Sequence, residues 1–451
     1  MPTKMAVLAS LVMGLVTPVA LADESVADPG GEWVGVAKTP EMIFELVLEI
    51  EREDEEWTGQ LKSPWPMSLE SVSADDSGVQ IVFYNQGRIE GDWEDGGVEG
   101  RFSMGGIDEP IRLVPLDSGE GKTLVEETAE LRAEHRPEPL EAVREGPAHE
   151  RIDNEAVEAL VAAANEAGSS GLALFYKGEL VSEWYAGGEP KPVESMSVTK
   201  PILALGVGVL LEEERLDSID TYVHEIFPEW DEGDHAKVTI RHLLNHSSGL
   251  GRAMDNHALN KAEDRVTFAL KTDIVTAPGE KTEYNNNAMN LLAGVVGKAA
   301  GQPADEYLAE QVFEPLGIED FEWSRDEAGN PQGQAGLSIR AGDLARLGQL
   351  ILQEGVWDGE RLVDAEFLEK SVRPQSPETP IGLAWFLELD GEQVRAVHHS
   401  GDLGQFMLML PEEELVAVRM VAGSKGYDPA SDTMQEFNQL IIESFADWGD
   451  D

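Results

Sequence analysis

Apolar and polar residues alternate along the chain from about residue 31 to residue 117. Residues 43–50 carry apolar side chains at every second position, which is the period of a strand with one buried face. Residues 79–84 and 111–115 show further strand-like runs, and turn-forming residues separate these runs at short intervals. The pattern predicts a small antiparallel domain, a meander or a barrel-like sheet, over residues 23–117.

The pattern changes after residue 117. Residues 118–150 are charged and contain proline, which indicates a linker that is partly helical. Residues 171–181 read as a β-hairpin that turns at Lys177-Gly178, and residues 201–211 form an almost wholly apolar run, which is typical of a buried helix. Further strand-like runs near the C-terminus complete a mixed α/β domain with an antiparallel sheet and many helices, which we expect over residues 151–451.

The N-terminus has the pattern of a secretory signal peptide. Lys4 precedes an uncharged stretch over residues 5–22, and small residues stand at Ala20 and Ala22, where signal peptidase reads. We expect cleavage after residue 22, a periplasmic or secreted location, and no stable membrane anchor afterwards. The alternative is an uncleaved anchor, because about 18 apolar residues can just span a membrane, although Pro18 disturbs a continuous helix.

The chain is strongly acidic and has no cysteine. Asp and Glu number 87 against 33 Lys and Arg, which gives a net charge of −54. Such a field repels nucleic acid and anionic membranes, so we expect no nucleic-acid partner. The acidic residues are scattered along the chain, as in proteins from salty habitats. The absence of cysteine excludes disulfides, thiolate nucleophiles and Cys-ligated zinc.

The first chemical motif is Ser197-Val198-Thr199-Lys200, at the start of the apolar run. Residues three apart on a helix share one face, so the Ser197 hydroxyl is expected beside the Lys200 amine. A serine hydroxyl becomes a good nucleophile when a base takes its proton. Lysine can be that base when burial lowers its pKa, and the following apolar residues predict such burial.

Two later motifs extend this one. Tyr284-Asn285-Asn286 follows a turn, and His399-Ser400-Gly401 stands near a strand end. In this order the three motifs resemble those of the active-site-serine β-lactamase and penicillin-binding protein superfamily, in particular its class C β-lactamase-like branch of esterases and D-amino-acid peptidases. The resemblance covers about residues 150–445 and implies a serine β-lactamase-like transpeptidase fold. It does not cover the N-terminal β domain.

The resemblance also implies a role for each residue. Ser197 attacks the substrate carbonyl, while Lys200 and Tyr284 share the proton transfers, with Tyr284 as a phenolate or as a proton shuttle. The remaining expected site residues bind substrate: Asn286, which also holds Lys200; His399, which orients the substrate; Gly401, which allows close approach; and Asp402. The backbone N–H groups of Ser197 and Asp402 are the expected oxyanion hole. The acyl-enzyme route requires no cofactor and no metal.

His399 departs from the lysine of many relatives. Lysine would offer a fixed cation to a β-lactam carboxylate, whereas histidine is often neutral at pH 7. This favours an esterase or D-amino-acid-type peptidase that acts on a small ester, amide or peptide. A β-lactamase and a slowly acylating penicillin-binding or sensor module remain alternatives, as does a β domain that acts as a binding module. His242 and His246, four residues apart, are a weak candidate zinc pair, because the glutamate of a metalloprotease helix is absent.

Overall fold

The computed structural model describes residues 29–39, 42–53, 56–63, 67–83, 87–104, 107–146, 152, 154–251, 256–375, 379–423, 426–427, 437–438 and 440–441. The expected signal peptide, residues 1–22, lies outside the described residues. None of the helices in the described part of the chain is long and apolar enough to cross a membrane.

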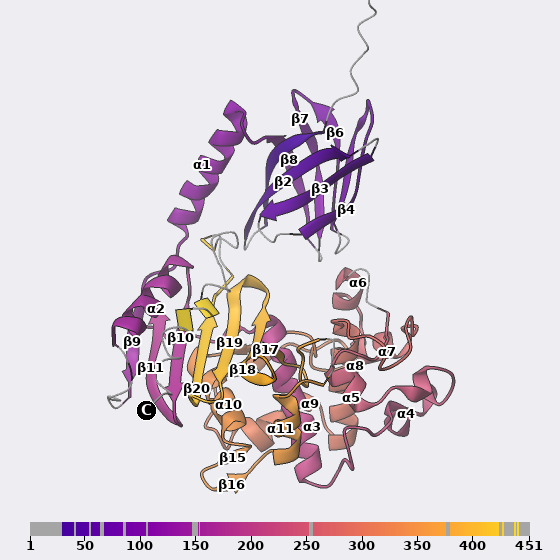
Figure 1. Cartoon of the computed structure of the whole chain (residues 1–451), viewed down its shortest axis with the longest axis vertical. Coiled ribbons are helices and arrows are strands. Elements are labelled where there is room, and N and C mark those ends of the chain that lie inside the picture. The colour runs from indigo at the N-terminus through magenta and orange to yellow at the C-terminus, as the bar shows by residue number, and fades with distance from the viewer. Residues whose placement is uncertain are drawn as a thin grey trace, which may run out of the picture.

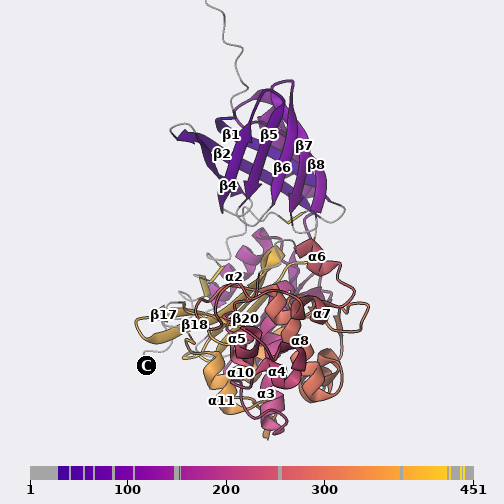
Figure 2. The same ribbon diagram turned by 90° about the vertical axis from the view of Figure 1, so that its right-hand side faces the viewer.

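The N-terminal unit is a closed barrel of eight antiparallel strands (Figures 1 and 2). Its strands are β1 (Gly31–Lys38), β2 (Ile43–Glu53), β3 (Glu56–Ser63), β4 (Met67–Ala74), β5 (Gly78–Phe83), β6 (Arg88–Glu94), β7 (Gly97–Met104) and β8 (Ile107–Pro115). The alternating side chains of β2 fill the interior, since Phe44, Leu46 and Leu48 are all buried. A barrel of eight strands is just wide enough for side chains to fill it, so this interior is a packed core.

Glycines allow neighbouring barrel strands to come close. Gly91 of β6 pairs with Gly100 of β7. A Cβ atom on Gly100 would lie 2.2 Å from the carbonyl oxygen of Glu90, and one on Gly91 would lie 2.4 Å from that of Glu99. The glycines that recur in this part of the sequence therefore stand where a side chain would collide with the next strand.

The C-terminal unit is built on a seven-stranded antiparallel sheet in the order β17-β18-β19-β20-β10-β11-β9. These strands are β9 (Leu140–Glu145), β10 (Gly171–Tyr176), β11 (Glu179–Ala186), β17 (Phe386–Asp390), β18 (Gln393–Gly401), β19 (Gln405–Leu410) and β20 (Leu415–Met420). Short strands form two smaller sheets: β12 (Val193–Glu194), β13 (Phe321–Trp323) and β14 (Leu337–Ile339), and then β15 (Val356–Trp357) and β16 (Glu360–Arg361). The mixed α/β fold with an antiparallel sheet, preceded by an all-β unit, is confirmed.

Some helices pack on the sheet, and others form a helical region beside it (Figure 1). They are α1 (Gly119–Glu134), α2 (Asn154–Glu166), α3 (Thr199–Glu212), α4 (Val223–Ile226), α5 (Ile240–Leu244), α6 (Asn256–Asn260), α7 (Arg265–Leu270), α8 (Asn286–Ala300), α9 (Ala304–Leu308), α10 (Ala341–Leu352) and α11 (Ala365–Ser371). Every residue of α3 from Thr199 to Leu210 is buried, as the apolar run predicted. Helix α3 packs against α8, α9 and α11, and its first residues, Thr199 and Lys200, are already fully buried.

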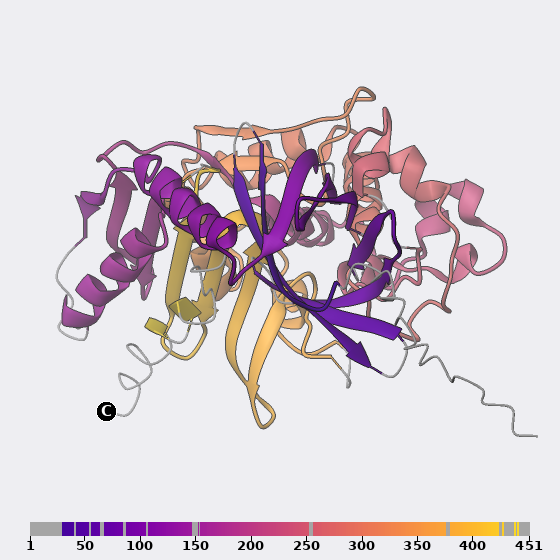
Figure 3. The same ribbon diagram turned by 90° about the horizontal axis from the view of Figure 1, so that it is seen from above.

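The segment expected to be a linker contributes to both units. Helix α1 runs along the side of the molecule from the barrel to the sheet, and Figure 3 shows it from above. Strand β9 then pairs with β11 as the outermost strand of the large sheet. This strand has no clear sequence pattern, because only Leu140 of its six residues is buried.

Candidate active site

Ser197 lies at the entrance to helix α3. A single turn of 3-10 helix, Met196–Val198, leads into it, and Met196 has a φ of +48°. Left-handed backbone at a residue other than glycine is uncommon and often marks a functional site. The turn is anchored by Ser195, whose N–H donates to the Leu337 carbonyl at 2.7 Å and whose Oγ lies 3.0 Å from the hydroxyl of Thr199. These bonds hold the backbone turn that carries Ser197.

Lys200 lies one helical turn after Ser197, and its side chain is fully buried. Its Nζ is 2.9 Å from Ser197 Oγ and donates to the main-chain oxygen of Gln334 at 2.8 Å. Burial lowers the pKa of Lys200 to about 7, and the nearby Asp402 carboxylate opposes this effect. A large fraction of the amine is therefore neutral near pH 7 and can accept a proton from the serine.

Tyr284 completes the group around the serine hydroxyl. Lys200 Nζ lies 4.7 Å from the centroid of its ring. Burial raises the pKa of Tyr284, while a hydrogen bond with Ser197 opposes the rise. The phenol thus keeps its proton, which favours the proton shuttle over the phenolate. Asn285, the next residue, caps helix α8 by accepting from the N–H of Ala288 at 3.0 Å.

The turn between β18 and β19 lies against Ser197. A Cβ atom on Gly401 would lie 2.7 Å from the Ser195 carbonyl oxygen and 3.0 Å from the N atom of Ser197, so no side chain fits there. The next three residues, Asp402–Gly404, turn the chain into β19. This contact brings the backbone near Asp402 close to that of Ser197, as an oxyanion hole made by these two N–H groups requires.

Two buried polar side chains that sequence reasoning missed hold this turn. Arg419 donates to the Gly404 carbonyl oxygen at 3.2 Å, and Gln405 Nε2 donates to the Leu403 carbonyl oxygen at 3.3 Å. Leu403 has a φ of +66°. Side chains of β19 and β20 therefore hold the turn through hydrogen bonds to its carbonyl oxygens.

His399 lies beside Tyr284 as a neutral residue. Its side chain is buried, its Nδ1 lies 2.7 Å from the Ser400 carbonyl oxygen, and its ring lies 6.5 Å from that of Tyr284. Burial is the main reason that the pKa of His399 lies well below its ordinary value of 6.5, and the charge of Lys200 adds to the effect. Phe386, which the sequence did not single out, lies 5.2 Å from the His399 ring and 6.2 Å from the Tyr284 ring.

Two expectations, the role of Asn286 and the candidate zinc pair His242 and His246, have different outcomes. Asn286 begins helix α8 directly beyond Asn285, and its bond to Lys200 stays a prediction. The ring of His242 accepts the N–H of Thr239 at 3.2 Å and helps to cap α5, whereas His246 lies against Tyr284 with ring centroids 4.8 Å apart. Among the described residues, no group of three or more His, Asp or Glu side chains could hold a metal ion.

Comparison with known proteins identifies relatives of this part of the chain. A penicillin-binding protein of Bacillus subtilis is 32% identical over 134 residues, which are 28% of this chain and 29% of that protein. Esterase EstB of Burkholderia gladioli is 34% identical over 143 residues, which are 28% of this chain and 36% of the esterase. The chain thus spans well under two thirds of the length of these curated relatives.

The fold has solved counterparts. The structure of a penicillin-binding protein homologue from Caulobacter crescentus matches with a TM-score of 0.52 at 16% identity and covers 68% of this chain and 100% of that one. The family model described as Beta-lactamase matches residues 155–440, more than half of the 451 residues. As the three motifs predicted, the chain belongs to the beta-lactamase family of serine hydrolases.

Proposed function

We propose that this protein is an exported serine esterase that hydrolyses small carboxylic esters through an acyl-enzyme on Ser197. One observation carries the proposal. The buried amine of Lys200 lies 2.9 Å from Ser197 Oγ and has a pKa of about 7. A base with a pKa near the working pH, within hydrogen-bond reach of the nucleophile, is the arrangement that general-base catalysis requires.

The reaction then proceeds in two stages. In the first, Ser197 Oγ forms a bond to the ester carbonyl carbon while its proton moves to neutral Lys200. The carbonyl oxygen becomes an oxyanion, which accepts hydrogen bonds from the N–H groups of Ser197 and Asp402. The tetrahedral species collapses, the bond to the leaving alkoxide breaks, and the proton passes to that oxygen through Tyr284.

In the second stage water replaces the alcohol. Neutral Lys200 removes a proton from the water as its oxygen attacks the acyl carbon, and the same N–H groups hold the second oxyanion. The bond to Ser197 Oγ breaks, and the proton returns to that oxygen. The carboxylic acid loses its proton to solvent and leaves as an anion, which the acidic surface of the protein, with a net charge of −54, repels.

The neutral state of His399 supports an esterase over the other candidates. A D-amino-acid peptide or a β-lactam presents a carboxylate, and a buried histidine with a pKa well below 6.5 offers it no charge. Beside His399 the site presents the ring of Phe386, an apolar surface that suits an ester better than an anion. The match to a penicillin-binding protein keeps a D-amino-acid-type peptidase as the second candidate.

Export is part of the proposal, and its support comes from the sequence. The charge at Lys4, the uncharged stretch over residues 5–22 and the small residues Ala20 and Ala22 form a secretory signal. We expect a mature protein that begins at Asp23 and remains in the periplasm or medium without a membrane anchor. N-terminal sequencing of the protein from each cell fraction measures both the cleavage site and the location.

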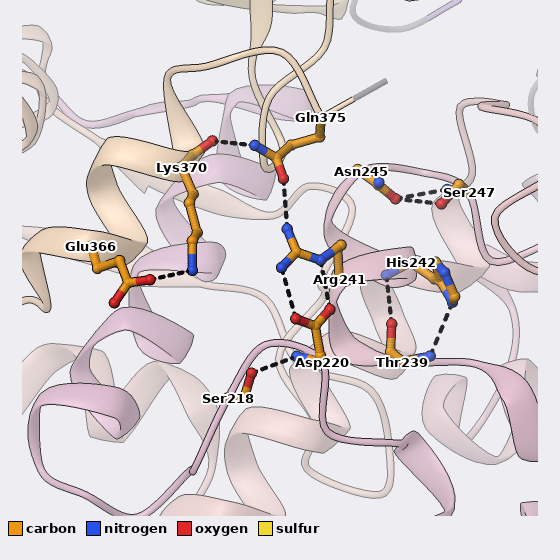
Figure 4. Close-up of polar contacts among 10 residues, drawn as sticks. All are labelled: Ser218, Asp220, Thr239, Arg241, His242, Asn245, Ser247, Glu366, Lys370 and Gln375. Carbon is orange, nitrogen blue, oxygen red and sulfur yellow. Dashed lines mark hydrogen bonds and ion pairs between the residues drawn. The ribbon is translucent and has the colours of Figure 1, made fainter. Parts of the chain in front are cut away.

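Intact mass spectrometry tests the assignment. The purified protein is mixed with a fluorophosphonate or with a penicillin, and turnover of p-nitrophenyl esters is measured in parallel. We expect one fluorophosphonate adduct, rapid ester turnover and no long-lived penicillin adduct. Ser197→Ala should lose both the adduct and turnover. Ser218→Ala, at a half-buried serine whose hydroxyl accepts from the N–H of Asp220 (Figure 4), should keep both. A stable penicillin adduct without ester turnover would instead identify a peptidase or sensor.

A further inference from the structure

We propose that His246 is a positioning residue that holds Tyr284 in place for proton transfer. This role rests on the proposed function, because it assumes that the Tyr284 phenol moves protons at Ser197. His246 contributes no bond to the serine or the lysine that would make it catalytic itself. Its contacts instead surround the tyrosine.

His246 touches the chain on both sides of Tyr284. Its carbonyl oxygen accepts the N–H of Glu283 at 2.7 Å, and its Nδ1 accepts the N–H of Asn285 at 3.3 Å. Its ring packs against the phenol ring, with centroids 4.8 Å apart and planes inclined by 43°. One residue therefore fixes the backbone at Glu283, the peptide that follows the tyrosine and the ring itself.

The protonation state of His246 suits this task. Because Nδ1 accepts a hydrogen bond from a backbone N–H, the single proton of the neutral ring is on Nε2. Burial, with a smaller contribution from the positive charge of Lys200, lowers the pKa of His246 to about 3. The ring thus stays neutral across the pH range in which an esterase works, and the bond to Asn285 persists while Lys200 gains and loses protons.

The segment that carries His246 is braced from outside (Figure 4). Arg241 of α5 bonds both carboxylate oxygens of Asp220, at 2.6 and 2.8 Å, and donates to Gln375 Oε1 at 2.7 Å. Across His246 itself, the Ser247 hydroxyl donates to Asn245 Oδ1 at 2.6 Å. The segment is thus fixed to two other parts of the fold, at Asp220 and Gln375, and a side chain that positions another requires such support.

Two features of His246 oppose folding and indicate a functional reason for it. Its φ is +57°, in the left-handed region that residues other than glycine seldom adopt. Its Nε2 is buried and has no hydrogen-bond partner among the described residues. Proteins break local rules of this kind mainly at functional sites.

Two substitutions of His246 test this positioning role. Both keep the left-handed backbone, but only one keeps an acceptor for the N–H of Asn285. Asparagine and glycine both tolerate the left-handed conformation. The side-chain oxygen of His246→Asn can still accept from Asn285, whereas His246→Gly has no acceptor. We expect His246→Gly to lower kcat for p-nitrophenyl acetate by about 100-fold with little change in KM, since a small misplacement of a reacting group has effects of this size. His246→Asn should keep most of the kcat that His246→Gly loses.

The controls separate positioning from folding. His242→Asn changes a histidine of the same segment whose ring caps α5 (Figure 4), and it should keep kcat near the wild-type value. The Tm of each variant reports its stability, and His246→Phe replaces the glycine variant if that protein does not fold. Equal losses of kcat in the Asn and Gly variants, or a wild-type kcat in the Gly variant, would overturn the proposal.

A second readout keeps this inference distinct from the proposed function. The rate at which a fluorophosphonate forms its bond to Ser197 Oγ and releases fluoride depends on activation of the serine, whatever the natural substrate. If the wild-type protein reacts with the probe but does not turn over esters, the esterase proposal fails. The order of the His246 variants in the probe reaction then still decides whether His246 positions Tyr284.

Discussion

Lys200→Met should make the protein inactive and, near neutral pH, more stable. Methionine is flexible enough to fill the volume of the buried side chain and carries no charge. The pKa of Lys200 is about 7 in the folded protein and 10.5 in its ordinary state. Since the folded-state value is the lower one, the unfolded chain binds the proton more tightly, and folding costs free energy wherever the unfolded lysine is charged.

The size of this effect follows from the two pKa values. Near pH 7 the difference disfavours the folded wild-type protein by about 4 kcal/mol, and near pH 9.5 by only about 1 kcal/mol. The variant lacks this term but leaves the Gln334 oxygen, now bonded at 2.8 Å, without its donor, at a cost of about 1–3 kcal/mol that does not vary with pH. The stability advantage of Lys200→Met should therefore shrink by about 3 kcal/mol between these pH values.

Urea unfolding followed by tryptophan fluorescence measures this change. Both proteins are unfolded near pH 7 and near pH 9.5 at one ionic strength, so that the titration of all other groups cancels in the difference between them. A difference in unfolding free energy that does not change with pH would refute the reasoning. Lys200 would then be charged in the folded protein, and its assignment as the base would lose its physical support.

Three further predictions concern pH, the turn at Gly401 and salt. The kcat/KM for p-nitrophenyl acetate should rise as the pH passes through about 7, because protonated Lys200 cannot accept a proton; a flat profile between pH 5.5 and 8 would contradict this. Gly401→Ala should lower kcat by at least about 10-fold, since its Cβ would lie 2.7 Å from the Ser195 oxygen and displace the turn; wild-type kcat in this variant would show that the turn position does not matter. Molar NaCl should raise the urea midpoint, because salt screens the repulsion within a chain of net charge −54, and a midpoint that falls would count against a salt-adapted surface.

Much of the fold followed from periodicity. The apolar run after Lys200 identified a buried helix, and the turn at Lys177-Gly178 identified the hairpin of β10 and β11, where both turn residues have positive φ. Strand β9 was missed, because an edge strand with one buried side chain has no apolar period. The pattern of apolar residues therefore predicts a helix or strand that buries several of its own side chains. It does not predict an exposed edge strand, whose position depends on the strand with which it pairs.

The candidate site also has a part that the sequence predicts and a part that it does not. Ser197, Lys200, Tyr284 and His399 were found from motifs, and the structure brings all four together. The acceptor of the Lys200 amine is the main-chain oxygen of Gln334, and an oxygen that every residue possesses gives no sequence signal. The sequence did not indicate that His246 lies beside Tyr284, because this contact depends on how two distant loops pack.

The large sheet also determines when activity can first appear. Its central pair joins β10 to β20, and the Ser170 hydroxyl bonds the Met420 carbonyl oxygen 250 residues further along the chain. Pairing between such distant segments must wait for loop closure and is slow. Ser197 and Lys200 are synthesised well before the turn that faces them, which comes from residues 401–404. A growing chain therefore carries its nucleophile through nearly half of its synthesis without a working site, and the hydrolase becomes active only as its last strands join the sheet.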